Sequence, residues 1–230
     1  MKTNNYKIDN SIEKLNKRKS TLFLDQKEQI EIKNKLKKEN YEIYSLFKDC
    51  DKVIFYKETP PTIKLFKIEN SKDLRHQDIL GTILSLGIDS SYIGDIIKIE
   101  DFFYIFVLEE ISFYLKQNLT KIKKENVFLK EEKLSMFENF ERVFEEIEIH
   151  VSSNRLDVLL ASLLNLSRSK VEEKIKNKEV LINYETATKT SYFLRENDIF
   201  SVRKYGKYKY QGIVRETKKK KYIVKILKYT

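Results

Sequence analysis

A stripe of leucines in the last third of the chain is the feature that most constrains its fold. The leucines recur at the spacing of one helix face: Leu156, Leu159, Leu160, Leu163 and Leu164. Asn154 stands at the expected cap of this helix. A second helix is predicted from Ser167, because Leu166 and Val171 occupy the positions of a hydrophobic staple. Short strands are predicted to follow, at residues 180–182, 198–202, 211–216 and 222–227.

The first part of the chain alternates strands with helices. Apolar runs and helical periods predict strand 53–56, strand 63–68, helix 76–87, strand 93–99, strand 102–108, helix 109–119 and strand 127–129. A further helix is predicted over 22–40, and strands 53–56 and 63–68 could pair as a hairpin. The order of elements predicts an α+β fold with its helices on one face of a sheet.

The distribution of charge predicts the domain boundaries. Residues 151–230 contain 19 Lys and Arg against 8 Asp and Glu, whereas the remainder contains 26 against 27. A lysine-rich genome would raise the total, but it does not explain an excess confined to one end. We expect an amino-terminal arm over 1–21, an α+β domain over 22–130, an acidic connector with a strand over 131–150, and a basic module over 151–230.

The basic module predicts a polyanionic partner. An anionic membrane would explain the charge equally well, but no strongly apolar helix face is available to insert. No apolar run has the length of a membrane span, and no secretory signal is recognised after Met1. Cys50 is the single cysteine, so no internal disulfide can form. These features predict a cytoplasmic protein that does not bind membranes.

The second helix of the basic module separates its charges by face. On a helical wheel Val171 and Ile175 form the buried edge. A stripe of cations and one amide lies beside that edge: Lys170, Lys174, Asn177 and Lys178. Arg168 and Ser169 occupy the first turn, where free backbone N–H groups favour a phosphate. The alternative, a solvated face of Lys–Glu pairs, stays open.

The segment 203–209 repeats the combination of cations and rings. If it is extended, Arg203, Tyr205, Lys207 and Lys209 share one face and Lys204 lies on the other. Cations beside an aromatic ring suit a sugar–phosphate chain with exposed bases. An edge strand that lysines protect from aggregation explains the segment equally well. The lysine run 218–221 is predicted as a hairpin tip, which needs no ligand.

Short motifs of the basic module resemble the S4 RNA-binding domain. They are Arg155-Leu156-Asp157, Leu166-Ser167-Arg168-Ser169-Lys170, Val180-x-Ile182-Asn183 and Asp198-Ile199-x-Ser201-Val202. From about residue 20 the chain is also similar to the bacterial YlmH family. That similarity rests on His76-Gln77-Asp78-Ile79-Leu80-Gly81, Ile93-Gly94-Asp95-Ile96, Asn118-Leu119-Thr120-Lys121 and Arg203-Lys204-Tyr205-Gly206-Lys207-Tyr208-Lys209. The resemblance implies a YlmH-type α+β RNA-binding-like domain followed by a small S4 (αL-motif) domain of two helices and a short-stranded sheet.

The resemblance also implies a ligand and a role. It implies ribosomal RNA and tRNA as ligands and action on the large ribosomal subunit, in quality control of stalled nascent chains. Separately, the protein is expected to be a monomer, although the sequence leaves the oligomeric state open. The expected RNA contacts are Arg155, Arg168, Ser169, Lys170, Lys174, Asn177, Lys178, Asn183, Arg203, Lys204, Tyr205, Lys207 and Lys209. Reversal of Lys170 and Lys174 to Glu is expected to abolish co-sedimentation with ribosomes. The alternative is a cell-division adaptor that binds proteins and has incidental RNA affinity.

Three residues depart from the family patterns. The S4 pattern prefers Gly where Lys178 and Asn197 stand, and YlmH proteins often have Pro where Thr190 stands. Asn tolerates a left-handed backbone, so Asn197 is a mild change. Lys178 is expected to shift the end of its helix slightly.

The sequence predicts no catalysis, metal or cofactor. Its glycines are too scattered for a phosphate-binding loop: Gly81, Gly87, Gly94, Gly206 and Gly212. Arg155-Leu156-Asp157 is similar to the catalytic motif of pseudouridine synthases, but here it opens a helix of the S4 unit and no synthase-sized domain follows. His76 could pair with Asp78 as an acid–base or metal site, although a polar helix start is the simpler interpretation. No metal-spaced cluster surrounds His76, His150 or Cys50.

Overall fold

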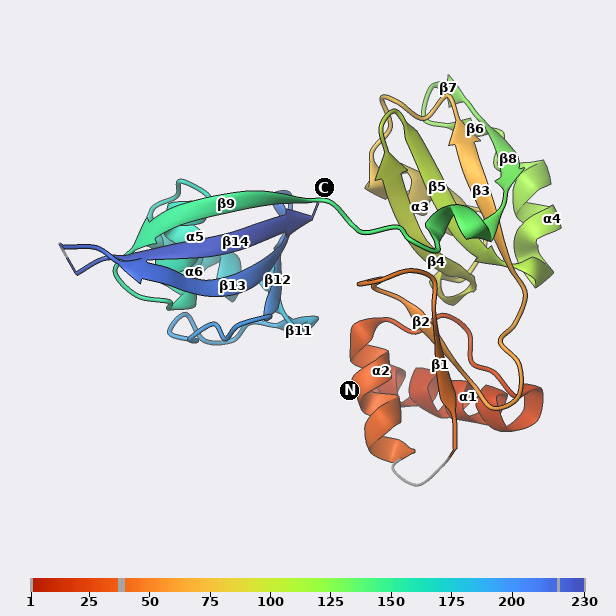
Figure 1. Ribbon diagram of the computed structural model, residues 1–230, viewed down its shortest axis with the longest axis horizontal. Coiled ribbons are helices and arrows are strands. Elements are labelled where there is room, and N and C mark those ends of the chain that lie inside the picture. The colour runs from red at the N-terminus through yellow and green to blue at the C-terminus, as the bar shows by residue number, and fades with distance from the viewer. Residues whose placement is uncertain (1, 37–39, 219, 230) are drawn as a thin grey trace. The chain divides into compact units, whose positions relative to one another are not determined.

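The chain folds as two compact units, residues 1–142 and residues 143–230 (Figure 1). The computed structural model describes residues 2–36, 40–218 and 220–229, with side chains from residue 7 onward in those ranges. The division after Arg142 falls inside the segment expected as a connector. Within the described residues, no helix combines the length and the apolar character needed to cross a membrane.

The amino-terminal part of the first unit is a helix pair beside a two-stranded ribbon. Its elements are α1 Lys2–Arg18, α2 Gln26–Lys35, β1 Glu42–Ser45 and β2 Val53–Tyr56. Helix α1 buries Ile8 and Leu15 completely, so the expected arm packs as part of this unit. The prediction of one helix over 22–40 is wrong at its amino end. Asp25 caps α2 there, in a capping box with Glu28.

Strand β2 pairs with β1, so the predicted hairpin between 53–56 and 63–68 is wrong. The other edge of β2 is also occupied, because Leu24 N donates to Val53 O at 2.8 Å and Thr21 N donates to Phe55 O at 2.8 Å. With both edges of β2 hydrogen-bonded, the next strand has no free edge to join there. That strand lies in the central sheet instead.

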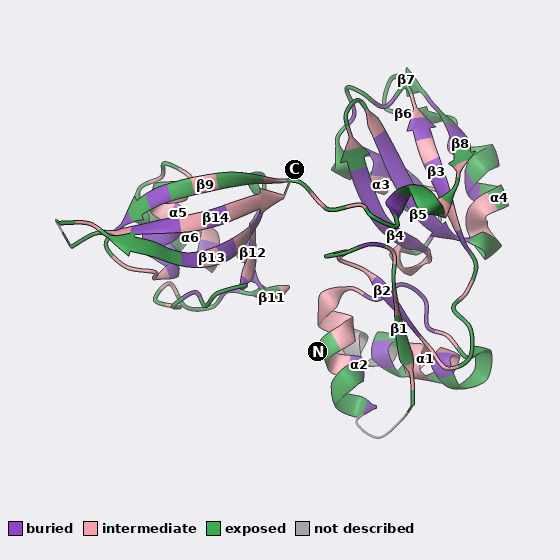
Figure 2. Ribbon diagram, in the orientation of Figure 1, coloured by how far each residue is buried: buried purple, intermediate pink, exposed green. Residues whose placement is uncertain are grey.

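A four-stranded antiparallel sheet in the order β4-β5-β3-β8 forms the centre of the first unit. Along the chain the elements are β3 Ile63–Glu69, α3 His76–Ser85, the 3-10 turn η1 Ser90–Tyr92, β4 Ile93–Ile99, β5 Phe102–Leu108, α4 Glu109–Asn118, β6 Lys121–Ile122, β7 Glu125–Asn126, β8 Phe128–Glu132 and the 3-10 turn η2 Leu134–Phe137. The prediction of helices on one face is confirmed, because Ile79 of α3 and Leu115 of α4 share a core with one sheet face. Phe23 and Phe137 pack on the other face, so both faces are covered (Figure 2).

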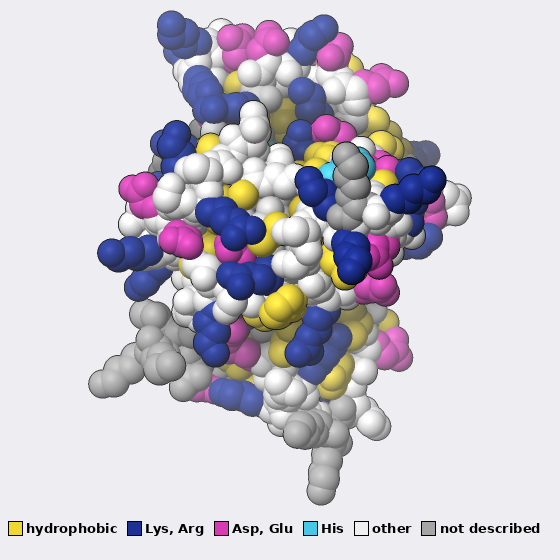
Figure 3. Space-filling view, turned by 90° about the vertical axis from the view of Figure 1, so that its left-hand side faces the viewer, with side chains coloured by type: hydrophobic (Ala, Val, Ile, Leu, Met, Phe, Trp, Pro, Cys, Tyr) yellow, Lys and Arg dark blue, Asp and Glu magenta, His cyan; other side chains and the backbone are white. Residues whose placement is uncertain are grey.

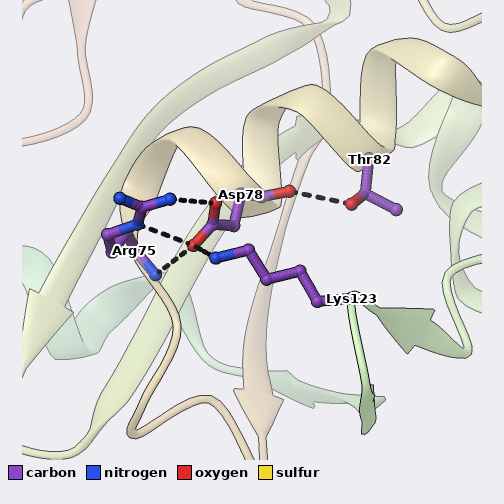
Figure 4. A network of polar contacts seen from close by, with 4 residues as sticks. All are labelled: Arg75, Asp78, Thr82 and Lys123. Atoms are coloured by element: carbon purple, nitrogen blue, oxygen red, sulfur yellow. Dashed lines mark hydrogen bonds and ion pairs between the residues drawn. The ribbon is translucent and has the colours of Figure 1, made fainter.

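Asp78 joins the start of α3 to the β6–β7 hairpin (Figure 4). Its carboxylate accepts hydrogen bonds from Arg75 Nε at 3.0 Å and Lys123 Nζ at 2.6 Å. These cations hold the pKa of Asp78 well below its usual range. The Asp78 carbonyl also accepts from Thr82 Oγ1 at 2.8 Å. Asp78 is thus committed to the helix start, which favours the structural interpretation of His76.

The expected acidic connector divides between the two units. Glu131 and Glu132 lie in β8, inside the central sheet. Arg142 ends the first unit with Nη2 placed 3.0 Å from Oδ2 of the buried Asp95. Strand β9 Phe144–Val151 then belongs to the second unit and pairs with its last strand. The observed strand is longer than the predicted strand 147–149.

The second unit packs two helices on one face of a six-stranded sheet. Its remaining elements are α5 Leu156–Leu163, α6 Arg168–Lys176, β10 Val180–Ile182, β11 Glu185–Thr186, β12 Ile199–Val202, β13 Gly206–Glu216 and β14 Tyr222–Tyr229. The strand order is β11-β10-β12-β13-β14-β9. The leucine stripe of α5 shares a core with Phe200, Tyr208 and Tyr210 of the sheet, which confirms the predicted two-helix unit.

The two helices of this unit begin differently. Ser167 caps α6 as predicted, and its Oγ accepts from Lys170 N at 3.4 Å. Asn154 does not cap α5, because Arg155 holds that position and the Asn154 amide donates to Leu194 O at 3.1 Å. The first amides of α5 instead donate to main-chain carbonyls of the loop between β11 and β12: Leu156 N to Tyr192 O at 2.8 Å and Asp157 N to Thr190 O at 3.2 Å. A side-chain cap is therefore not needed.

The lysine run forms the turn between β13 and β14. Thr217 N donates to Lys221 O at 2.7 Å, and Glu216 pairs with Tyr222. The hairpin position predicted for residues 218–221 is confirmed for the described part of the run. Lys219 lies outside the described residues.

Candidate nucleic-acid interface

Helix α6 and the β12–β13 turn form one surface of the second unit. Arg203 N donates to Glu179 O at 2.9 Å, which fixes the turn beside the carboxyl end of α6. Val171 and Ile175 are buried as predicted, so the polar side chains of α6 point outward. We define the α6 surface as Arg168, Ser169, Lys170, Lys174, Asn177, Lys178, Arg203, Lys204 and Tyr205. The structure thus brings together two segments that the sequence offered separately.

Lys174 links helix α6 to the residues that follow it and to the β12–β13 turn. Its Nζ lies 2.8 Å from Glu179 Oε2 and 5.1 Å from the centroid of the Tyr205 ring. The hydrogen bond to Glu179 raises the pKa of Lys174. Reversal of Lys174 to Glu would place two carboxylates together, so this substitution would break the ion pair with Glu179 as well as any contact with RNA. The predicted double reversal with Lys170 therefore does not separate binding from folding.

The other cations of the α6 surface are available to a ligand. Arg168, Lys170, Lys178, Arg203 and Lys204 are all exposed. Within the described ranges, none of their charged groups is hydrogen-bonded or ion-paired. Figure 3, seen from the left-hand side of Figure 1, shows lysine and arginine side chains spread over the surface with acidic side chains between them. On the α6 surface, Glu179 lies among the cations, and the exposed Glu172 and Glu173 are on the same helix.

Lys178 occupies the left-handed position that ends α6. Its φ is 59°, Lys178 N donates to Ile175 O at 3.0 Å, and Glu179 N donates to Lys174 O at 2.9 Å. These two bonds form a Schellman motif, in which the left-handed residue is usually Gly. The motif forms with lysine in place of Gly.

We expect Lys178→Gly to stabilise the second unit by about 0.5–1 kcal/mol, because Gly adopts a left-handed backbone without the steric cost that lysine incurs. Asn197, with φ of 70°, stands at the second position where the S4 pattern prefers Gly. Asn197→Gly should give a smaller gain, because Asn tolerates this conformation. Chemical denaturation of both variants measures the difference, and an equal or larger gain for Asn197→Gly would contradict this explanation.

Lys207 and Lys209 do not belong to the α6 surface. Tyr208 and Tyr210 alternate with them in β13 and are buried in the core that contains the helices. The two lysines therefore project from the opposite face of the sheet. Lys207 Nζ lies 4.4 Å from the centroid of the Tyr229 ring. The prediction of one shared face for 203–209 is wrong, because the chain turns at residues 203–205 before the strand begins.

Arg155 and Asn183 are engaged inside the unit. Arg155 Nε and Nη2 lie 3.0 and 3.1 Å from the two carboxylate oxygens of Asp157, whose side chain is 3% exposed. The Asn183 amide donates to Asp198 Oδ1 at 2.8 Å and accepts from Ile199 N at 2.9 Å. Both side chains stabilise the fold of the unit, and their contact with RNA stays a prediction.

The sequence did not indicate which side chains lie beside Lys174 and Lys207. Glu179 follows Lys174 by five residues, and only the Schellman turn brings the two side chains together. The Tyr184 ring lies 5.0 Å from Lys207 Nζ across the sheet. Asn183 and Tyr184 both have positive φ in the turn between β10 and β11. An Asn at such a position is a local sequence signal of a tight turn.

Comparisons with known proteins identify two RNA-binding domains in the chain. Residues 59–136 match the family described as "Putative RNA-binding domain in YlmH", and residues 154–200 match the S4 domain. A curated relative, "Ribosome-associated protein quality control protein P2" of Bacillus subtilis (strain 168), is 32% identical over 150 residues. Together these matches support a YlmH-type RNA-binding domain followed by an S4 domain.

The matches cover different shares of the proteins compared. The alignment with the Bacillus subtilis protein spans 65% of this chain and 58% of the relative's length. A solved structure, "Cell division protein ylmH from Streptococcus pneumoniae", is 21% identical with a TM-score of 0.48, over 60% of this chain and 94% of that one. Helix α6 lies inside the S4 match, whereas the turn 203–205 follows it.

Proposed function

We propose that this protein binds structured ribosomal RNA and tRNA on the large ribosomal subunit through the α6 surface. It acts there without catalysis, as a cytoplasmic monomer, in quality control of stalled nascent chains. The observation that carries the proposal is the set of unpaired cations on the α6 surface: Arg168, Lys170, Lys178, Arg203 and Lys204. The name of the Bacillus subtilis relative, a ribosome-associated quality control protein, supports the ribosome as the partner.

The frame of the α6 surface suits phosphate recognition. Val171 and Ile175 anchor the helix in the core, and the Lys174–Glu179 ion pair holds the turn beside it. Because the backbone of this frame is already ordered, only the cationic side chains lose conformational freedom when they meet a folded RNA. Double-stranded RNA is recognised mainly by shape and backbone, so separated cations that match phosphate positions are sufficient. Ser169, in the first turn of α6, adds a hydroxyl near free amide groups.

A non-catalytic role is supported by the state of Asp157. This carboxylate would be the catalytic group if the Arg155-Leu156-Asp157 motif worked as in pseudouridine synthases. Its side chain is 3% exposed and accepts two hydrogen bonds from Arg155. A buried carboxylate held by its neighbour stabilises the helix start and does not reach a uridine.

The dependence of binding on salt tests the proposal. If the unpaired cations of the α6 surface contact about five phosphates, the log–log slope of affinity against salt should be roughly −4. Co-sedimentation with purified large subunits at several salt concentrations gives this slope. A slope near zero would indicate a protein interface, as expected of a cell-division adaptor, and would contradict the proposal.

A further inference from the structure

A pocket of about 210 Å³ lies in the first unit, between α1, α2 and η1. Its floor is apolar and buried, and consists of Leu22, Phe23 and Leu24. Its walls carry polar side chains, among them Lys7 and Lys14, which lie two turns apart on one face of α1. The volume is below the roughly 300–1,000 Å³ of sites for drug-sized ligands, so a ligand of the size of a nucleotide would fill the pocket and extend beyond its rim.

The ammonium groups at this pocket are unpaired. Among the residues described, neither Lys7 nor Lys14 has a hydrogen bond or ion pair at Nζ, and the nearby charge of Asp89 attracts both ammonium groups without contacting them. Lys14 Nζ lies 5.6 Å from the centroid of the Tyr92 ring. Burial and the neighbouring Arg18 lower the pKa of Lys14, so a bound anion would stabilise its charged form.

The acidic groups at the pocket are already partly engaged. Asp89 Oδ1 accepts from Ser91 N at 2.9 Å and from Ser91 Oγ at 2.6 Å. Glu28 Oε2 accepts from Asp25 N at 2.9 Å, and burial raises the pKa of Glu28. Each carboxylate keeps a second oxygen that can accept a hydrogen bond. Amino and imino groups on the edge of a nucleobase are donors of the right kind.

We propose that this pocket binds one nucleoside phosphate, with the phosphate at Lys7 and Lys14 and the base between Tyr92 and the two carboxylates. Cations for phosphate, a ring for stacking and acceptors for a base edge then stand within a single small site. The nucleotide is either free or an unpaired nucleotide of an RNA chain. The site lies outside the α6 surface, so it works independently of the proposed ribosome contact.

Amide chemical shifts of the full chain test this inference. The probes are the four nucleoside monophosphates, a short unstructured RNA and inorganic phosphate. We expect saturable shifts at Ser11, Lys14 and Tyr92 with a monophosphate or with the RNA. Saturation by the RNA alone would identify an RNA nucleotide as the ligand, and saturation by a monophosphate would identify a free one. Lys14→Ala should weaken this binding about tenfold, because it removes a charge-assisted hydrogen bond.

Lys17→Ala is the matched control. Lys17 lies on the same helix, outside the pocket, and pairs with Glu13. This variant should bind the probes as the unaltered chain does. The absence of pocket shifts with every nucleotide probe would overturn the proposal, and so would shifts that Lys14→Ala leaves unchanged. Equal affinity for inorganic phosphate would show that no base is recognised and would overturn it as well. Because the α6 surface is intact in both variants, ribosome binding remains a separate readout.

Discussion

The double substitution Arg168→Glu and Lys170→Glu is expected to lower affinity for the large ribosomal subunit about 100-fold or more, since it removes two phosphate contacts and adds two repulsions. Both side chains are exposed and unpaired in the described structure, so no internal contact is lost. Glutamate in the first turn of α6 also suits the helix dipole, which keeps the helix stable. A co-sedimentation titration at fixed salt measures the change.

Lys176→Glu provides the control for this experiment. Lys176 is exposed on α6 but lies away from the stripe of Lys170, Lys174 and Lys178. It alters the charge of the same helix without touching the α6 surface, so affinity should fall by no more than about threefold through long-range electrostatics. If Lys176→Glu weakened binding as much as the double substitution, the α6 surface would not be the contact.

Asp198→Ala is expected to destabilise the second unit by about 3 kcal/mol, because it removes a buried carboxylate that accepts three hydrogen bonds. Asp198 is 8% exposed, and its carboxylate accepts from Asn183 Nδ2 at 2.8 Å, Arg195 N at 2.9 Å and the Tyr192 hydroxyl at 3.1 Å. These bonds join the β10–β11 turn to the loop before β12. Hydrogen exchange of the β10 and β12 amides in the full chain measures the loss.

Glu196→Ala separates this effect from a general change of charge in the loop. Glu196 lies two residues before Asp198 and is exposed. Its removal should change stability by less than about 0.5 kcal/mol, as expected of a surface site. Comparable losses in the two variants would show that the buried hydrogen bonds of Asp198 are not what stabilises the unit.

Much of the fold follows from local patterns. The leucine stripe fixed α5 because its spacing admits one buried helix face, and Val171 with Ile175 did the same for α6. The strands 93–99 and 102–108 were predicted with their observed bounds, because both are rich in apolar β-formers and flank a tight turn. The candidate site was predictable to the extent that exposed cations on α6 follow from the wheel.

The errors share a physical cause, which is pairing between distant segments. Strand β2 pairs with β1 because Leu24 already occupies its other edge, and no local pattern reports that contact. The α5 start needs no side-chain cap, because carbonyls from the loop at 190–192 accept its amides. In the sequence Lys174 is like the neighbouring lysines, and only the fold brings Glu179 and Tyr205 into contact with it.

By itself the sequence determined the two-unit α+β organisation, the basic second unit and the resemblance to YlmH and S4 RNA-binding domains. Periodicity, charge and short motifs are patterns of a few neighbouring residues, so they can be recognised without knowledge of the fold. Tertiary structure alone decided which cations are free. It placed Lys207 and Lys209 on the opposite face of the sheet and paired Lys174 with Glu179. It left Arg168 and Lys170 exposed. The availability of a charge depends on what packs beside it, and that is set by contacts between segments far apart in the chain.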